Sequence, residues 1–250
     1  MVDEIEDAFE KGLRHSNKHL PEGTEVGAMD FFSGVAHQIA TRVMLGEELC
    51  RDEKFLSKTK SLLESIFDTA IVIVTLPLGP FRNLLARPLT LIHKWKLQSC
   101  ASMLRPVVSQ RLERRQLLKE GAPQHGPLDA IEWTLDLRGN HPQYDSVDWI
   151  TTELLHNLWA ASSAPGGLMT EVVYQLLFEP RYMALLREEA VKAVEEFGWT
   201  EKMLAKLNLQ DSFIREVNRL YPIGSGSSPS SCSVECPTNA PSHMLSYSDR

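Results

Sequence analysis

The stretch Leu209-Gln-Asp-Ser-Phe-Ile-Arg-Glu-Val-Asn-Arg-Leu-Tyr-Pro222 predicts an amphipathic helix that carries a carboxylate and a guanidinium one turn apart. On a helical wheel, Phe213 and Leu220 define an apolar stripe, and Glu216 falls within that stripe. Burying a lone carboxylate is costly, so Arg219 at i+3 is expected to hold Glu216 in an ion pair. An ordinary surface ion pair is the alternative, because short motifs recur by chance.

The segments before this helix follow one another in a recognisable order: Glu179-Pro-Arg-Tyr182, Leu185-Leu-Arg-Glu-Glu-Ala190, Gly198-Trp-Thr200 and then Glu216-x-x-Arg219. This order resembles helices J and K of cytochrome P450, especially the fungal monooxygenases of secondary metabolism. In that family the Glu-x-x-Arg pair is a structural lock beneath the haem. Further stretches are similar to its G to H region and to helix E, namely Arg105-Pro-Val-Val-Ser-Gln-Arg111 with Leu128-Asp-Ala-Ile-Glu-Trp133, and Arg42-Val-Met-Leu-Gly46 with Leu49-Cys-Arg51.

The resemblance implies an all-α fold class, a partial cytochrome P450 fold over residues 1–222 from about helix C or D to helix K. The haem-ligand loop and most of the β-sheet of the family are expected to be missing. Residues 223–250 are rich in Ser and Pro and are predicted to form a disordered tail. This abrupt change of composition suggests a frameshift, a retained intron or an early stop.

Periodicity and breakers predict helices almost throughout and no alternating strand pattern. Asp145 or Ser146, Thr200 and Asn208 are expected to cap the helices that follow them. The cluster of Arg111, Arg114, Arg115 and Lys119 is interpreted as a solvated helix face. The predicted helices are 3–17, 27–45, 53–75, 88–119, 127–137, 147–178, 181–196, 200–206 and 209–220, and the apolar run Ala70–Gly79 resembles the end of helix F.

The centre of helix 147–178 reads Trp159-Ala-Ala-Ser-Ser-Ala-Pro-Gly-Gly167. Pro165 has no N–H to donate to the carbonyl of Ala161, so the sequence predicts a kink or an opening here. A packing role for these small residues is an equally good interpretation. By resemblance this helix corresponds to helix I of the P450 family, where oxygen binds.

The resemblance assigns four positions on that helix. Ala160 and Ala161 match the small residues that let the backbone approach the haem. Ser163 stands at the position of the proton-relay acid, and Ala164 stands at the position of the Thr. Because Ala164 has no hydroxyl, Ser162 or Ser163 with a water would have to replace it in proton delivery.

The cysteines give no haem ligand of the family form F-x-x-G-x-[RH]-x-C-x-G. Around Cys232 and Cys236 neither glycine of that pattern is present, and these residues with Cys50 and Cys100 show no disulfide framework. Cys232-x3-Cys236 and His15-x3-His19, the latter at one-turn helical spacing, each offer only two metal ligands. We therefore expect no metal site.

The composition of the chain limits the classes of partner that it is expected to bind. A net charge of −7 argues against nucleic acid, and no stretch has the roughly twenty apolar residues of a transmembrane anchor. The absence of an anchor suggests that the front of the protein is missing, because eukaryotic members are usually held on the endoplasmic reticulum membrane. The location of this chain is left open.

Two functions remain as alternatives. The complete form would be a haem-dependent monooxygenase that oxidises an apolar small molecule with electrons from NADPH-cytochrome P450 reductase, as the resemblance implies. The chain itself would then be truncated and would not bind haem through a Cys. The other function is a non-enzymatic helical remnant, pseudoenzyme or scaffold, so enzymatic activity of this chain is left open.

Overall fold

The structure is a computed structural model that describes residues 2–15, 18–20, 23–75, 82–118, 127–137 and 146–222. The described residues are almost entirely helical, which confirms the predicted all-α class. In the part of the chain that is described, no helix is both long and apolar enough to span a bilayer. The elements are α1 (Val2–His15), β1 (Lys18–Leu20), β2 (Gly23–Glu25), α2 (Ala28–Leu45), α3 (Glu47–Cys50), α4 (Glu53–Thr75), α5 (Arg82–Leu118), α6 (Ala130–Asp136), α7 (Val147–Phe178), α8 (Pro180–Phe197), α9 (Glu201–Leu204) and α10 (Asn208–Leu220).

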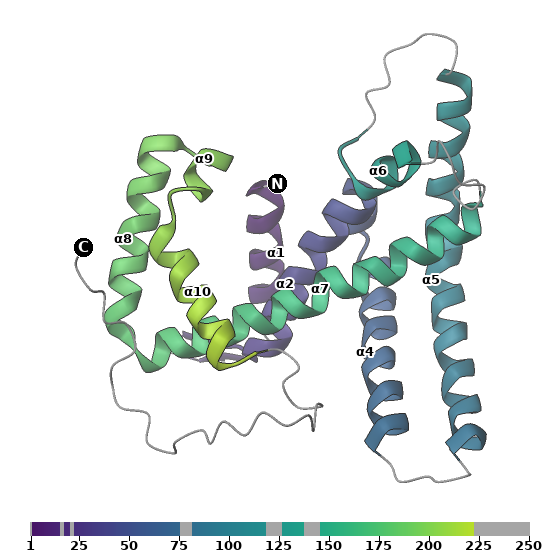
Figure 1. Ribbon diagram of the computed structural model, residues 1–250, viewed down its shortest axis with the longest axis horizontal. Coiled ribbons are helices and arrows are strands. Elements are labelled where there is room, and N and C mark those ends of the chain that lie inside the picture. The colour runs from purple at the N-terminus through teal and green to yellow at the C-terminus, as the bar shows by residue number, and fades with distance from the viewer. Residues whose placement is uncertain are drawn as a thin grey trace.

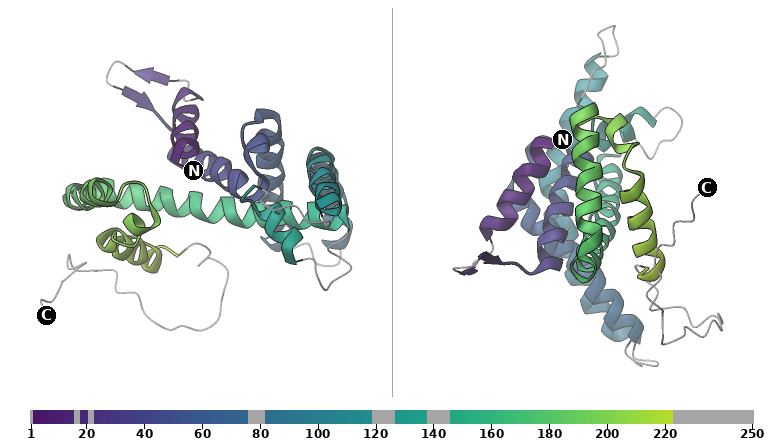
Figure 2. Two further views of the ribbon diagram at one scale, coloured as in Figure 1. Left: turned by 90° about the horizontal axis from the view of Figure 1, so that it is seen from above. Right: turned by 90° about the vertical axis from the view of Figure 1, so that its left-hand side faces the viewer.

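The long helix α7 runs through the molecule and organises the other helices (Figure 1). The pair α4 and α5 packs near its N-terminal end, and α8 to α10 lie at its C-terminal end. Helices α1 and α2 lie on one side of α7, while α10 lies on the opposite side (Figure 2). Helices α2, α4, α5, α6, α8 and α10 contact α7 directly.

Two apolar clusters hold these helices together. The larger one joins α2, α4, α5, α6 and α7, and its fully buried members include Phe55, Leu104, Ile131 and Leu158. The smaller cluster fixes α10 to α8 and α7 through Leu186, Phe213 and Val217, with partly buried side chains of α7 packed around them.

The closest helix packing is between α2 and α7. A Cβ atom at Gly166 would lie 2.8 Å from Ser33 Cα and 3.0 Å from Ser33 Oγ, so only glycine allows this approach. The predicted opening at Pro165 is wrong, because α7 is continuous over Val147–Phe178. Pro165 removes a single backbone hydrogen bond, and the neighbouring turns keep the helix together through their packing on α2.

Several predicted boundaries differ from the structure. A short antiparallel hairpin joins α1 and α2, with Lys18 opposite Glu25, and strands of three residues are too short to show an alternating pattern. Helix α5 begins at Arg82 instead of residue 88, since it continues through Pro88. Helix α9 is shorter than the predicted 200–206. Residues 76–81, which include the whole Leu76–Gly79 end of the apolar run, lie outside the described residues, as does Lys119.

The predicted caps have mixed outcomes. Ser146 caps α7 by accepting a hydrogen bond from the Trp149 N–H. Thr200 is the N-cap position of α9, but its hydroxyl donates to the Phe197 carbonyl instead. Asn208 is already the first residue of α10, and the prediction that it caps this helix is wrong.

Candidate functional site

The predicted site residues of α7 lie on two neighbouring faces of that helix. Ala160 and Ala164 are exposed, and they share one face because they are four residues apart. Ala161 is partly buried and packs against the larger core cluster. Ser163 is partly buried, and its hydroxyl donates to the Trp159 carbonyl over 2.9 Å. The exposed face is thus lined by methyl groups, with one serine at its edge.

Ser162 belongs to a buried polar contact between three helices, which the sequence analysis missed. His37 of α2 lies between Ser162 of α7 and Thr59 of α4, with Nδ1 3.2 Å from Ser162 Oγ and Nε2 2.8 Å from Thr59 Oγ1. Burial lowers the pKa of His37 to about 4, so the ring is neutral at physiological pH. A neutral ring has one donor and one acceptor nitrogen, so one hydroxyl must donate to it.

This contact removes Ser162 from the set of proton-relay candidates. Its side chain is only 2% exposed and faces α2, away from the exposed face of Ala160 and Ala164. The expectation that Ser162 could replace the missing Thr hydroxyl is therefore wrong. A polar residue at the centre of an apolar helix was the available sequence signal, but nothing in the sequence identifies His37 as its partner.

Glu216 and Arg219 form the predicted ion pair on α10. Arg219 Nε donates to Glu216 Oε2 over 2.8 Å and its Nη2 donates to Oε1 over 2.7 Å, and these bonds lower the pKa of Glu216. The predicted burial is wrong, because the side chains are 27% and 65% exposed. Phe213 and Val217 fill the apolar stripe instead, and Glu216 lies at its edge.

A group outside the predicted set holds the start of α10. The Glu189 carboxylate of α8 accepts hydrogen bonds from the backbone N–H groups of Leu209 and Gln210, over 2.8 and 3.0 Å. These N–H groups have no partner within their own helix, so Glu189 satisfies them. Helix α10 is formed and packs against α8 and α7.

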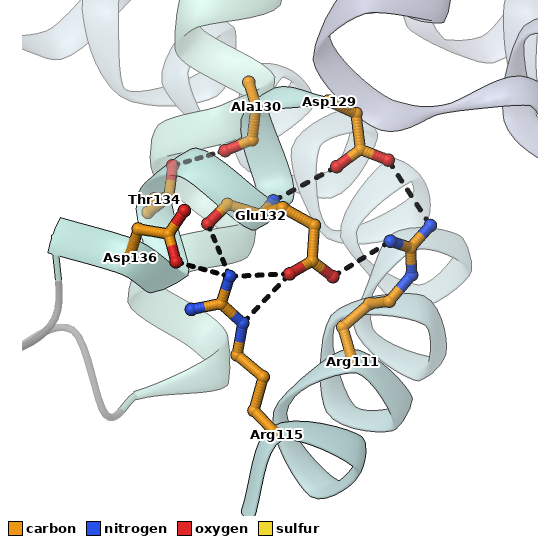
Figure 3. A network of polar contacts seen from close by, with 7 residues as sticks. All are labelled: Arg111, Arg115, Asp129, Ala130, Glu132, Thr134 and Asp136. Atoms are coloured by element: carbon orange, nitrogen blue, oxygen red, sulfur yellow. Dashed lines mark hydrogen bonds and ion pairs between the residues drawn. The ribbon is translucent and has the colours of Figure 1, made fainter. Parts of the chain in front are cut away.

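The arginine cluster of α5 is an internal ion-pair network, and the prediction of a solvated face is wrong for Arg111 and Arg115. Both side chains are less than 20% exposed. Arg111 contacts Asp129 and Glu132, while Arg115 contacts Glu132 and Asp136 (Figure 3). Burial raises the pKa of Asp129 despite the nearby guanidinium. Arg114 is exposed, as predicted.

The described thiols do not fit the role of an iron ligand, which requires an accessible thiolate. Cys50 and Cys100 are 0% exposed, and burial raises their pKa to about 12 and about 11. Cys232 and Cys236 lie outside the described residues. Among the described residues, the two thiols are therefore not accessible to a haem iron.

Metal ligands are not gathered elsewhere in the described ranges. No group of three or more His, Cys, Asp or Glu side chains there could hold a metal ion. His15 ends α1 and His19 lies in β1, so the two are not one helical turn apart as their spacing suggested. Because His19 lies in a strand, the helical periodicity on which that expectation depended does not apply to this pair.

Comparison with known proteins identifies relatives of this chain. The chain is 31% identical over 223 residues to cytochrome P450 monooxygenase sirB of Leptosphaeria maculans, which covers 89% of this chain and 41% of that protein. It is 29% identical over 204 residues to an ent-kaurene oxidase of Gibberella intermedia, covering 81% and 36%. The chain thus spans about two-fifths of the length of these relatives.

The family profile matches a still longer part of the chain. The profile named cytochrome P450 aligns with residues 1–235, which include every described helix and the Glu216 and Arg219 pair. Relatives of similar identity come from several fungi, including cytochrome P450 monooxygenase trt6 of Aspergillus terreus at 30%. On this evidence the chain belongs to the cytochrome P450 family.

Proposed function

We propose that this chain is the helical part of a haem-dependent monooxygenase that oxidises an apolar small molecule with electrons from NADPH-cytochrome P450 reductase. The observation that carries the proposal is the exposed methyl face of Ala160 and Ala164 on the central helix of the fold. A flat face of small side chains allows a planar macrocycle to approach the backbone. Ala160 would belong to this haem-facing surface, and Ala161, which also packs against the larger core cluster, would lie at its edge.

Of the two side chains at the proton-relay positions, only one can hold or move a proton. Ser163 would be the hydroxyl nearest to this face, but its proton is held by the Trp159 carbonyl. Ala164 supplies no group that can hold or move a proton. Proton delivery would therefore depend on Ser163 turning away from Trp159, and this part of the site supports slow or altered oxygen chemistry.

The 250-residue chain by itself is better suited to a non-enzymatic scaffold. Its described thiols are buried and protonated, and neither Cys232 nor Cys236 has the glycines of the haem-ligand loop. We therefore propose that this chain does not form a thiolate-ligated haem. The haem, when bound by a complete protein, supplies the oxidising chemistry, and these helices supply the surface on which it lies.

Haem titration of the purified chain tests the scaffold proposal. After reduction and addition of carbon monoxide, we expect no Soret band of a thiolate-ligated haem. A band of that type that disappears in Cys232→Ser or Cys236→Ser would overturn the proposal. The family role is tested by a chimera in which residues 1–222 replace the matching region of the complete sirB relative. This chimera should show the thiolate-type band, and Ala164→Thr should increase the fraction of NADPH electrons that appear in product.

A further inference from the structure

A cavity of about 540 Å³ lies between α1, α2 and α4. The residues that line it belong to α1, to the segment just before α2, to α2 and to α4, and none of these described residues belongs to α7. Its volume falls within the range of about 300 to 1,000 Å³ that is typical of small-molecule sites. The cavity is therefore large enough for a ligand that does not occupy the face of Ala160 and Ala164.

Two glycines give the cavity its shape. At Gly34 of α2 a Cβ atom would meet no atom within 4 Å, so the backbone of α2 borders open space at this position. At Gly12 of α1 a Cβ atom would lie 2.7 Å from the ring of Phe31, so only glycine allows this ring to lie against α1. Phe31 also makes edge-to-face contacts with Phe9 and Phe32, with ring centroids 5.6 and 5.1 Å apart. The Phe31 ring is thus a fixed aromatic wall of the cavity.

Gln38 contributes a buried hydrogen-bond acceptor to the same lining. Its side chain is 5% exposed, and its Nε2 donates to Glu4 Oε1 over 2.8 Å and to Asp7 Oδ2 over 2.7 Å. Because ionised carboxylates only accept, these bonds fix the orientation of the amide and use both of its N–H groups. No hydrogen bond from a described residue ends on the amide oxygen, Oε1. A donor on a ligand would satisfy this oxygen.

The charged side chains of the lining balance one another. Lys11 of α1 and Lys60 of α4 are basic. Asp30 of α2 and Glu53 of α4 are acidic, and Lys60 Nζ lies 4.0 Å from Asp30 Oδ1. An anion or a cation in the cavity would therefore meet charges of both signs and gain no net attraction. The lining favours a neutral ligand that carries a hydrogen-bond donor.

We infer that this cavity binds a neutral aromatic alcohol, whose hydroxyl donates to Gln38 Oε1 and whose ring lies over Gly34. A flat ring fits over the bare backbone at Gly34, and it gains an aromatic contact with Phe31. Val35 and Leu56, which also line the cavity, provide further apolar surface for the ring. The inference goes beyond the proposed function and does not depend on it, because the cavity and the haem-facing surface have no residue in common.

Two probes test the inference with the 250-residue chain, namely 2-naphthol and 2-methoxynaphthalene, which has the same rings but no donor. Titration calorimetry should show that 2-naphthol binds about tenfold more tightly, because only the alcohol can donate to the buried oxygen. In NMR spectra, 2-naphthol should also shift the side-chain amide signals of Gln38. Equal affinities for the two probes, or unchanged Gln38 signals at saturation, would overturn the inference.

Variants place the bound ligand within the molecule. Gly34→Leu adds a side chain that fills the cavity and should weaken 2-naphthol binding by about tenfold or more. Because leucine favours helix more than glycine does, this variant should fold, and circular dichroism verifies that it does. Ser102→Leu adds the same side chain at an exposed position of α5 outside the cavity and should leave the affinity unchanged.

A further variant separates this inference from the proposed function. Ala160→Leu alters the haem-facing surface and should leave 2-naphthol binding unchanged. Equal weakening by Gly34→Leu and Ser102→Leu, or loss of binding in Ala160→Leu alone, would overturn the inference. Since these titrations contain no haem, their failure leaves the proposed function standing, and failure of the haem test leaves the inferred cavity ligand standing.

Discussion

Glu189 of α8 caps α10 across a gap of twenty residues in the sequence, because its carboxylate accepts a hydrogen bond from the backbone N–H of Leu209 at 2.8 Å. The same carboxylate accepts from the N–H of Gln210. A negative charge at this end also interacts favourably with the helix dipole. The helix that carries Glu216 and Arg219 is thereby positioned by a neighbouring helix.

Replacing Glu189 by Ala is expected to lower the free energy of unfolding by about 1 to 2 kcal/mol, because two N–H groups lose a charged acceptor. Urea denaturation followed by circular dichroism measures the change. Glu188→Ala is the matched control, since Glu188 pairs with the exposed Lys192 on its own helix. Equal urea midpoints for the two variants would show that the cap contributes nothing.

Two glycine substitutions in helices should have opposite effects. Gly166→Ala places a Cβ atom 2.8 Å from Ser33 Cα, so α2 and α7 must separate, at a cost of about 1 to 3 kcal/mol. Gly34→Ala meets no atom within 4 Å and should stabilise α2 by about 0.5 to 1 kcal/mol. Thermal unfolding of both variants gives the comparison, and a stabilised Gly166→Ala protein would contradict the observed helix packing.

The ion-pair network of α5 and α6 should be sensitive to loss of its central carboxylate. Glu132→Ala leaves Arg111 and Arg115 without their main partner in a mostly buried position, so the expected loss is about 3 kcal/mol. Arg114→Ala, at an exposed position of the same helix, should change stability by less than about 0.5 kcal/mol. The urea midpoints of the two variants, compared with that of the unchanged chain, measure the two effects. A small effect of Glu132→Ala would mean that water replaces the carboxylate.

His37 predicts a pH dependence of stability. Its pKa is lowered from 6.5 to about 4 in the folded chain, so between these values the unfolded state binds more protons than the folded state. Stability therefore falls as the pH falls through this window, by an amount on the order of 3 kcal/mol. Urea unfolding at several pH values measures the slope. His37→Gln should flatten it, and an unchanged slope in this variant would assign the effect to other groups.

The Glu216 and Arg219 pair should contribute little to the stability of this chain. Arg219 is mostly exposed, and exposed ion pairs are screened by solvent. Glu216→Ala should leave the urea midpoint of the 250-residue chain unchanged, while Phe213→Ala should lower it by loss of buried apolar contacts. In the chimera with the sirB relative, the same Glu216→Ala change should instead reduce haem content. A strong effect in the isolated chain would restore the interpretation of a buried lock.

The helical class and most helix positions could be predicted from the sequence, because they depend on local periodicity and breakers, and the family was indicated by the resemblance of an ordered series of motifs. Ser146 caps α7 as expected, since an N-cap bond is made within one turn. The predicted cap at Asn208 is not formed, because the Glu189 carboxylate, which is distant in the sequence, accepts the hydrogen bond from the start of α10. The burial of Glu216 was also misjudged, because a helical wheel gives a direction but not what lies in that direction.

The features of the candidate site can also be separated into those that the sequence determined and those that only the tertiary structure decided. The amino-acid sequence by itself determined that Ala160 and Ala164 share one face of a helix, and that Ala164 has no hydroxyl. Only the tertiary structure decided that Ser162 faces His37 and that Arg111 and Arg115 point inward. These relationships join residues far apart in the chain, and they depend on how the helices pack, which local periodicity does not specify.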